Sequence, residues 1–104
     1  MMIDNVQKAL AGLPPIVAKE KAEHTAILER LKVLPSWRTL QRELHQMGIC
    51  AERLTSREFH QILIAIQLHH KLAQVNGTLD IETCATIFAM YDAWRRKKVR
   101  DAGK

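Results

Sequence analysis

Residues 55–77 read TSREFHQILIAIQLHHKLAQVNG and decide the fold. Thr55 followed three residues later by Glu58 is the pattern of a capping box, so a helix is predicted to begin here. Asn76 and Gly77 are typical of a helix end. Between these signals, apolar residues fall on nearly every side of the predicted helix. Such a helix is either central to a core or has a second face buried against a partner.

Two helices are predicted before this segment, at residues 4–12 and 14–33. Asp4 can cap the first helix, and Gly12 ends it. Pro14 and Pro15 suit the first turn of the second helix, because that turn's N–H groups lack intrahelical partners. Residues 18–26 of this helix are expected to be exposed or to lie on a partner, because alanines are their only apolar residues. The second half is expected to be core and contains Ile27, Leu28, Leu31 and Leu34.

Two more helices are predicted, one on each side of residues 55–77. Ser36 can cap a helix that ends at Gly48, and Asp80 can cap the last helix. Their apolar residues fall at helical spacing, as Trp37, Leu40, Leu44 and Met47 in one and Ile81, Cys84, Ile87, Phe88, Tyr91 and Trp94 in the other. The chain is therefore predicted to be all-α, a compact bundle of four to five helices in a single domain over residues 1–104.

The positive charge of the chain is concentrated at its C-terminal end. Residues 1–94 hold ten Lys and Arg against ten Asp and Glu, while residues 95–104 hold six basic residues against Asp101. This basic end accounts for the whole net charge of +5. Three interpretations of this end are open. It can be a solvated helix end, it can contact the phosphates of nucleic acid, because clustered Lys and Arg release counterions on binding, or it can be attracted to an anionic membrane or an acidic protein.

The sequence has no pattern typical of an enzyme or a cofactor site. The spacing of its five histidines and two cysteines does not fit a zinc site. Residues 72–83 do not fit a calcium loop, because Leu72 and Gln74 replace its first two ligands and Thr83 replaces its bidentate glutamate. Neither cysteine has a setting that would lower its pKa. We therefore expect a non-enzymatic protein without metal or cofactor.

The expected location is the cytoplasm. The first residues do not read as a signal peptide, and no apolar run approaches the ~20 residues of a membrane helix. Cys50 and Cys84 are expected to be free thiols, because the chain is not rich in cysteine.

A protein partner is the leading functional hypothesis. Ile64 lies among polar residues of the helix at residues 55–77, and Trp37 is expected to be exposed, so the apolar surface exceeds what one chain would hide. The predicted partner-binding residues are Ile64, Trp37, Gln67, Lys71 and His60. The expected function is that of a regulatory protein, such as an antiactivator or adaptor that binds a transcription factor, and the surplus surface predicts a homodimer.

The alternative hypothesis is a regulator that binds DNA or RNA. Residues 40–59 resemble a helix-turn-helix, with Leu44, Gly48 and Leu54 near the packing, turn and packing positions. The match weakens at Arg57, which stands where an apolar residue should pack. The candidate phosphate contacts are Arg95, Arg96, Lys97, Lys98 and Arg100, and those near bases are Arg38, Arg42, Arg53 and Arg57.

Overall fold

The computed structural model describes residues 2–103, with side chains from Asn5 onward, and shows an all-helical protein. The described chain forms five helices and no strand. They are α1 (Met2–Ala11), α2 (Ala18–Leu31), α3 (Trp37–Gln46), α4 (Ser56–His69) and α5 (Ile81–Ala102). The predicted all-α class is confirmed.

The predicted caps begin three of these helices. Ser36 Oγ accepts a hydrogen bond from the Thr39 N–H (3.3 Å), and Asp80 Oδ1 accepts one from the Thr83 N–H (2.7 Å). Thr55 and Glu58 form the complete capping box. The backbone N–H that Thr55 donates to Glu58 lowers the pKa of that carboxyl. Short polar side chains therefore set where α3, α4 and α5 begin.

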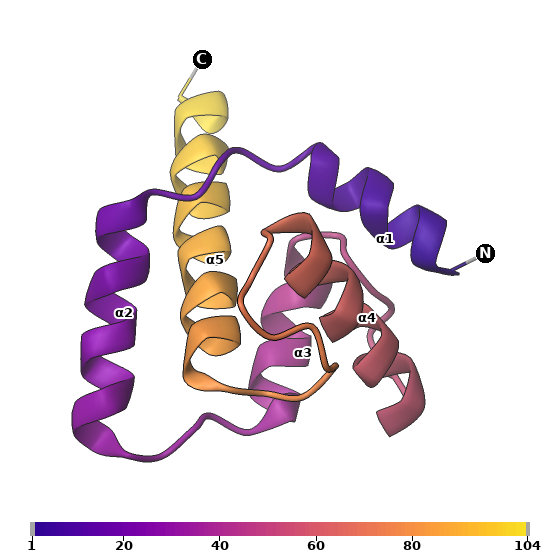
Figure 1. Cartoon of the computed structure of the whole chain (residues 1–104). Helices are drawn as coiled ribbons and strands as arrows, with labels where there is room; N and C mark the ends of the chain where they lie inside the picture. The colour runs from indigo at the N-terminus through magenta and orange to yellow at the C-terminus, as the bar shows by residue number, and fades with distance from the viewer. Residues whose placement is uncertain (1, 104) are drawn as a thin grey trace.

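α5 is the helix around which the others pack. It contacts α2, α3 and α4, while α1 packs on α4. Figure 1 shows α2 beside α5 and running in the opposite direction. An ion pair between Arg96 and Glu20 and a hydrogen bond between His24 Nε2 and Asp92 Oδ2 (2.6 Å) join these two helices.

The core forms where the inner faces of α1, α3, α4 and α5 meet. Its fully buried side chains include Leu40 and Leu44 of α3, Ile66 of α4 and Ile87 of α5. The predicted stripes of α3 and α5 thus face the core. α4 is buried mainly by this chain itself, and Leu68 is its most exposed large apolar residue, with 54% of its surface open.

Three predicted helix boundaries need correction. α1 begins at Met2, so Asp4 lies within the helix and not at a cap before it. α2 begins at Ala18, so Pro14 and Pro15 lie in the link before it rather than in its first turn. α4 ends at His69, well before the predicted stop at Asn76 and Gly77. The residues between form a loop whose Leu72 is buried, and the bonds that hold this loop are described below.

The core prediction for the second half of α2 is also corrected. Only Leu28 of this helix is buried, while Ile27 and Leu31 are exposed. Glu20 and His24 of α2 face α5, whereas Ile27 and Leu31 are left exposed to solvent. Between residues 2 and 103, no helix is both long and apolar enough to cross a membrane.

Candidate functional site

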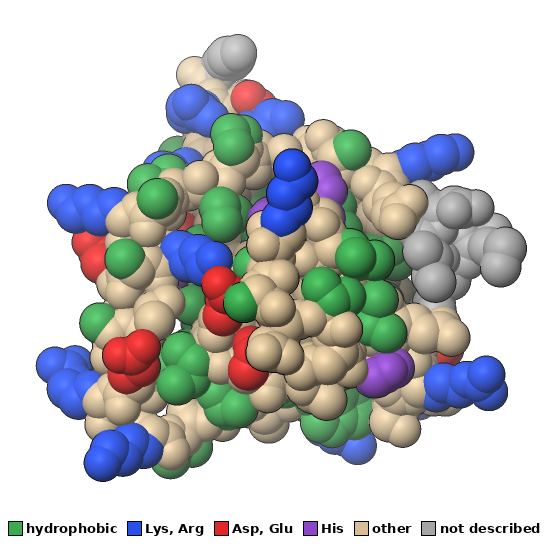
Figure 2. Space-filling view, viewed as in Figure 1, with side chains coloured by type: hydrophobic (Ala, Val, Ile, Leu, Met, Phe, Trp, Pro, Cys, Tyr) green, Lys and Arg blue, Asp and Glu red, His purple; other side chains and the backbone are tan. Residues whose placement is uncertain are grey.

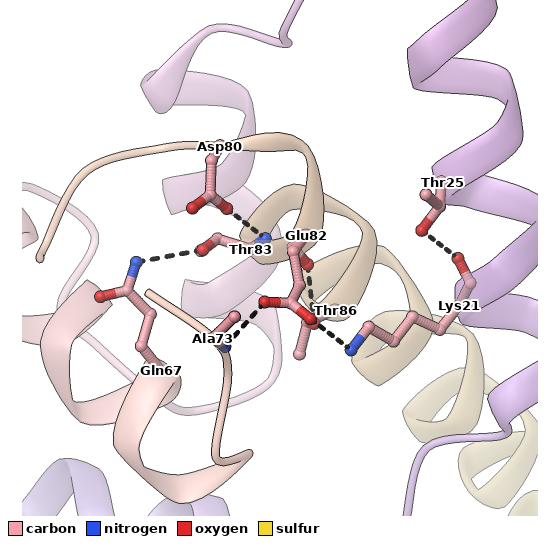
Figure 3. A network of polar contacts seen from close by, with 8 residues as sticks. All are labelled: Lys21, Thr25, Gln67, Ala73, Asp80, Glu82, Thr83 and Thr86. Atoms are coloured by element: carbon pink, nitrogen blue, oxygen red, sulfur yellow. Dashed lines mark hydrogen bonds and ion pairs between the residues drawn. The ribbon is translucent and has the colours of Figure 1, made fainter. Parts of the chain in front are cut away.

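Gln67, predicted to contact a partner, is completely buried and ties the loop after α4 to the core. Its Nε2 donates to Thr83 Oγ1 (3.0 Å) and to the Thr78 carbonyl oxygen (3.1 Å). Its Oε1 accepts from the N–H groups of Asn76 (3.0 Å) and Gly77 (2.9 Å). Figure 3 shows Gln67 of α4 reaching Thr83 at the start of α5. Gln67 is therefore a structural residue of the interior, which corrects its predicted surface position.

The other predicted partner-binding residues do not form one patch. Ile64 is half-buried, and Lys71 lies in the loop with a left-handed backbone (φ 53°) rather than on α4. Trp37 is half-buried because it packs against Phe59, with ring centroids 5.3 Å apart. His60 is exposed, and its Nδ1 donates to the Gly77 carbonyl oxygen (2.9 Å).

Trp37 and His60 do meet at one shallow hollow. Its volume is about 290 Å³, and its other lining residues are Ser56, Phe59, Leu63, Gly77 and Leu79. The floor is thus mainly apolar. Such a hollow can accept an apolar side chain of another molecule.

A second exposed apolar surface lies at the end of α2, and it was not predicted from the sequence. We call it the α2 edge. It consists of Ile27 and Leu31 of α2 with Val33 and Leu34 of the following link. Leu31 keeps 60% of its surface exposed and Val33 70%. Figure 2 shows hydrophobic side chains at the surface over α2 and over α4. The signal in the sequence is that residues 18–26, which precede the edge, have only alanines as apolar residues, so few large apolar side chains of α2 are available to pack against the core.

Arginines from two segments surround a polar hollow on α3. Arg38 and Arg42 of α3 and Arg53 of the following loop line it, and its volume is about 620 Å³. The remaining lining residues are Trp37, Gln41, His45, Gln46, Glu52 and Leu54. Gln41 Nε2 donates to the Glu52 carbonyl oxygen (2.5 Å), and His45 Nδ1 donates to that of Cys50 (2.9 Å). These bonds hold the loop that carries Arg53 against α3.

α5 extends this basic surface through Tyr91. The Tyr91 hydroxyl donates to Gln46 Oε1 (2.6 Å), and Gln46 lines the hollow. The Arg95 guanidinium lies 5.7 Å from the centre of the Tyr91 ring. Tyr91 also stacks on Trp94 (centroids 5.7 Å apart), and Lys98 lies 4.8 Å from that ring. We call the arginines of the hollow together with Arg95 the basic face, and it joins two of the predicted nucleic-acid segments.

The rest of the basic end points in other directions around α5. Arg96 is paired with Glu20 of α2. Arg100 lines, together with Arg95 of the basic face, a hollow of about 580 Å³ beside that pair, while Lys97 and Lys98 line one of about 410 Å³ next to α1. Residues 95–103 are exposed, so the basic end is a cationic helix tip rather than a single patch.

Residues 40–59 do not form a helix-turn-helix. α3 and α4 are joined by residues 47–55, whereas that motif uses a turn of about three or four residues. The Trp37–Phe59 contact brings the start of α3 to the start of α4, whereas the motif brings the end of one helix to the start of the next. Arg57, a predicted contact near bases, is exposed on α4 and does not line the hollow on α3.

A titratable cluster lies between α2, α3 and α5. Burial, with repulsion from Asp92, raises the pKa of Glu43 to about 7, although His24 acts in the opposite direction. A pKa near neutrality suits general acid–base catalysis, but Glu43 Oε2 is buried and has no hydrogen-bond partner. This buried and unpaired oxygen disfavours the ionised form of the carboxyl, which agrees with its raised pKa.

The described residues contain no group of three or more His, Cys, Asp or Glu side chains arranged to hold a metal ion. Burial raises the pKa of Cys50 to about 11 and that of Cys84 to about 12, the latter with help from Asp80. Both thiols are free and mostly protonated at neutral pH. No protein-family model, curated protein or solved structure matches this chain.

Proposed function

We propose that this protein is a non-enzymatic regulator that binds nucleic acid through the basic face. The observation that carries the proposal is the grouping of Arg38, Arg42 and Arg53 around one polar hollow. Arg95 lies over the ring of Tyr91, whose hydroxyl is hydrogen-bonded to Gln46 at that hollow. Three guanidinium groups from two chain segments converge there against one carboxylate, Glu52. Guanidinium groups match phosphate oxygens in geometry, and their positive charge displaces counterions from the nucleic-acid backbone.

The neighbouring side chains suit the same ligand. Gln41, Gln46 and His45 have amide and ring nitrogens beside the arginines and can hydrogen-bond phosphate, sugar or base edges. Trp37 and Tyr91 supply half-exposed aromatic edges at the two ends of the surface. A surface of this kind contacts mainly the backbone, so we expect affinity to depend strongly on salt and weakly on sequence.

The test is the salt dependence of binding, measured by fluorescence anisotropy with labelled duplex DNA, single-stranded DNA and RNA. One variant combines Arg38→Ala, Arg42→Ala and Arg53→Ala. Its matched control combines Lys19→Ala, Lys32→Ala and Lys71→Ala, which removes the same charge from exposed sites elsewhere. Each lost phosphate contact should reduce the slope of log affinity against log salt by about 0.9 on a duplex.

We expect the arginine variant to lose at least about tenfold in affinity at low salt and about 2.7 units of slope if all three arginines contact phosphates. The control should keep the slope of the unmodified protein to within about one unit. Equal losses of affinity and of slope in the two variants would overturn the proposal. So would the absence of binding to any of the three probes at low salt.

Protein binding is the second candidate function, and the hollow between Trp37 and His60 favours it. An antiactivator or adaptor would use such a hollow to hold an apolar side chain of its target, for example a transcription factor. With a purified target, Trp37→Ala should weaken binding by about tenfold or more if the hollow is the contact. A cytoplasmic location stays a prediction under either function.

A further inference from the structure

The start of α2 and the last turns of α5 border a hollow of about 580 Å³. Figure 1 shows these two segments side by side. Glu20 is the residue of α2 that lines the hollow, and the lining residues of α5 are Asp92, Arg95, Arg96, Val99 and Arg100. Residues three and four apart are neighbours on a helix, so these side chains of α5 share one side of it. Three guanidinium groups therefore meet at a hollow that is separate from the one on α3.

The negative charge at this hollow does not balance its arginines. Glu20 is paired with Arg96, whereas Arg95 and Arg100 have no ion-pair partner among residues 5–103. Asp92, the other acidic group of the hollow, is hydrogen-bonded to α2 instead. Arg96 and Arg100 are four residues apart, and like charges at this spacing on a helix repel each other. An anion bound between them would relieve this repulsion.

Glu20 is an incomplete partner for the arginines. Its Oε2 accepts a hydrogen bond from Arg96, but its Oε1 is buried and has no hydrogen-bond partner. A buried charged oxygen of this kind is unfavourable, because it has lost water and gained no donor in exchange. A phosphate group presents oxygens in several directions, and the planar fork of a guanidinium matches them. A phosphate can therefore engage more of these arginines than the carboxylate does.

We propose that Arg95, Arg96 and Arg100 form a site for a phosphate group, and that Glu20 occupies it as an internal competitor in the unbound protein. An incoming phosphate displaces the Glu20 carboxylate from Arg96 and bonds to the arginines in its place. The phosphates of a nucleic-acid backbone and those of a free polyphosphate share this chemistry. Because Arg95 also belongs to the basic face, a nucleic acid on that face lies next to the site. A free polyphosphate would use the site alone, so the site does not depend on the proposed function.

The first test titrates inorganic pyrophosphate into isotopically labelled protein at low salt and follows the arginine side-chain N–H signals by NMR. Glu20→Gln keeps the size of the side chain and removes its charge, so it should bind pyrophosphate at least about threefold more tightly than the unmodified chain. Glu23→Gln is the matched control, because Glu23 is exposed on the same helix and does not line the hollow. Its affinity should stay within about 1.5-fold of the unmodified chain.

Arg100→Gln tests the other side of the same hollow. Alone, it should weaken pyrophosphate binding at least about threefold, and combined with Glu20→Gln it should remove the gain. Circular dichroism of each variant checks that its helices are retained. Equal affinities of Glu20→Gln and Glu23→Gln, or a gain that survives Arg100→Gln, would overturn the inference.

A second titration with duplex DNA identifies the source of the phosphate. In Glu20→Gln, Arg96 becomes free for one further backbone contact, so the slope of log affinity against log salt should steepen by about 0.9. Tighter pyrophosphate binding without a steeper slope would assign the site to a free polyphosphate. If duplex DNA does not bind at all, the pyrophosphate result still decides whether the site exists.

Discussion

Gln67 on α4 and Thr83 on α5 share a hydrogen bond of 3.0 Å in the interior of the protein. Thr83 is also the residue whose N–H is capped by Asp80 at the start of α5. The buried amide of Gln67 thus joins the end of one helix, the loop after it and the start of the next. Glu82 adds a second tie, because its Oε1 accepts from the Ala73 N–H (3.0 Å) and its Oε2 pairs with Lys21 of α2 (3.5 Å), as Figure 3 shows.

Replacing Gln67 with leucine should lower the free energy of unfolding by about 2–4 kcal/mol, because it leaves the N–H groups of Asn76 and Gly77 without a partner. Urea unfolding followed by circular dichroism measures the change. Gln61→Leu is the control on the same helix, where the side chain is half-buried, and should cost under about 1 kcal/mol. Equal costs at the two sites would show that the Gln67 bonds do not stabilise the loop.

Glycine substitutions should have graded effects on thermal stability. Gly77 has a φ of +69°, and an added Cβ would lie 2.3 Å from His60 Cε1, so Gly77→Ala should cost about 2–3 kcal/mol. Gly48→Ala should cost only about 1 kcal/mol, because its φ is +80° but the space around it is open. Gly12→Ala should be neutral or stabilising. The melting temperature should therefore be lowest for Gly77→Ala, higher for Gly48→Ala and highest for Gly12→Ala. Any other order would contradict the backbone geometry at these three glycines.

The raised pKa of Glu43 predicts that stability falls as pH rises. The folded state holds the proton up to a pKa of about 7, whereas an unfolded chain releases it near 4.5, so the loss occurs between these values. Glu43→Gln, which mimics the protonated form, should match the unmodified protein at pH 4 and exceed it by about 1–3 kcal/mol at pH 8.

The lowered pKa of His70 has the opposite effect on stability, over an overlapping pH range. Burial, with repulsion from His69 and Lys21, lowers its pKa to about 4, so its contribution is lost as pH falls below about 6.5. The comparison of Glu43→Gln with the unmodified protein at each pH cancels this contribution. A difference that does not change between pH 4 and pH 8 would contradict the environment described for Glu43.

The two thiols should resist modification in the folded protein. Cys84 is fully buried, and the raised pKa of both groups leaves little thiolate at pH 8. We expect Ellman's reagent to react with Cys50 slowly, at least a hundredfold below the rate of a free thiol, and with Cys84 only after unfolding. Rapid reaction of Cys84 in native buffer would show that the core opens on that time scale.

Local signals in the sequence were sufficient to predict the starts of α3, α4 and α5 and the buried stripe of α3. Ser36, Thr55 and Asp80 each satisfy N–H groups within three residues, and such bonds depend only on nearby chain. The apolar spacing of α3 likewise predicted Leu40 and Leu44 as buried. These features need no knowledge of how distant segments pack.

Features set by distant contacts were not predictable in this way. Helical spacing treats Gln67 as an outward polar residue, but a loop nine and more residues later folds over it and supplies its partners. Leu31 was expected in the core, yet Glu20 and His24 are the side chains of α2 that face α5. Arg38 and Arg42 of α3 were predicted candidates. Their position near Arg95 depends on contacts between α3 and α5, where Tyr91 bonds to Gln46 and Arg95 lies over the Tyr91 ring.

Residue-resolved mapping by two-dimensional NMR tests nucleic-acid binding by the basic face most directly. A short DNA duplex titrated into isotopically labelled protein at low salt should shift the Trp37 indole and the amides of Arg38, Arg42 and Gln46. Signals from Leu31 and Val33 on the α2 edge should stay in place. Shifts confined to the α2 edge or the tip of α5, or no shifts at an equimolar ratio, would contradict binding at this face.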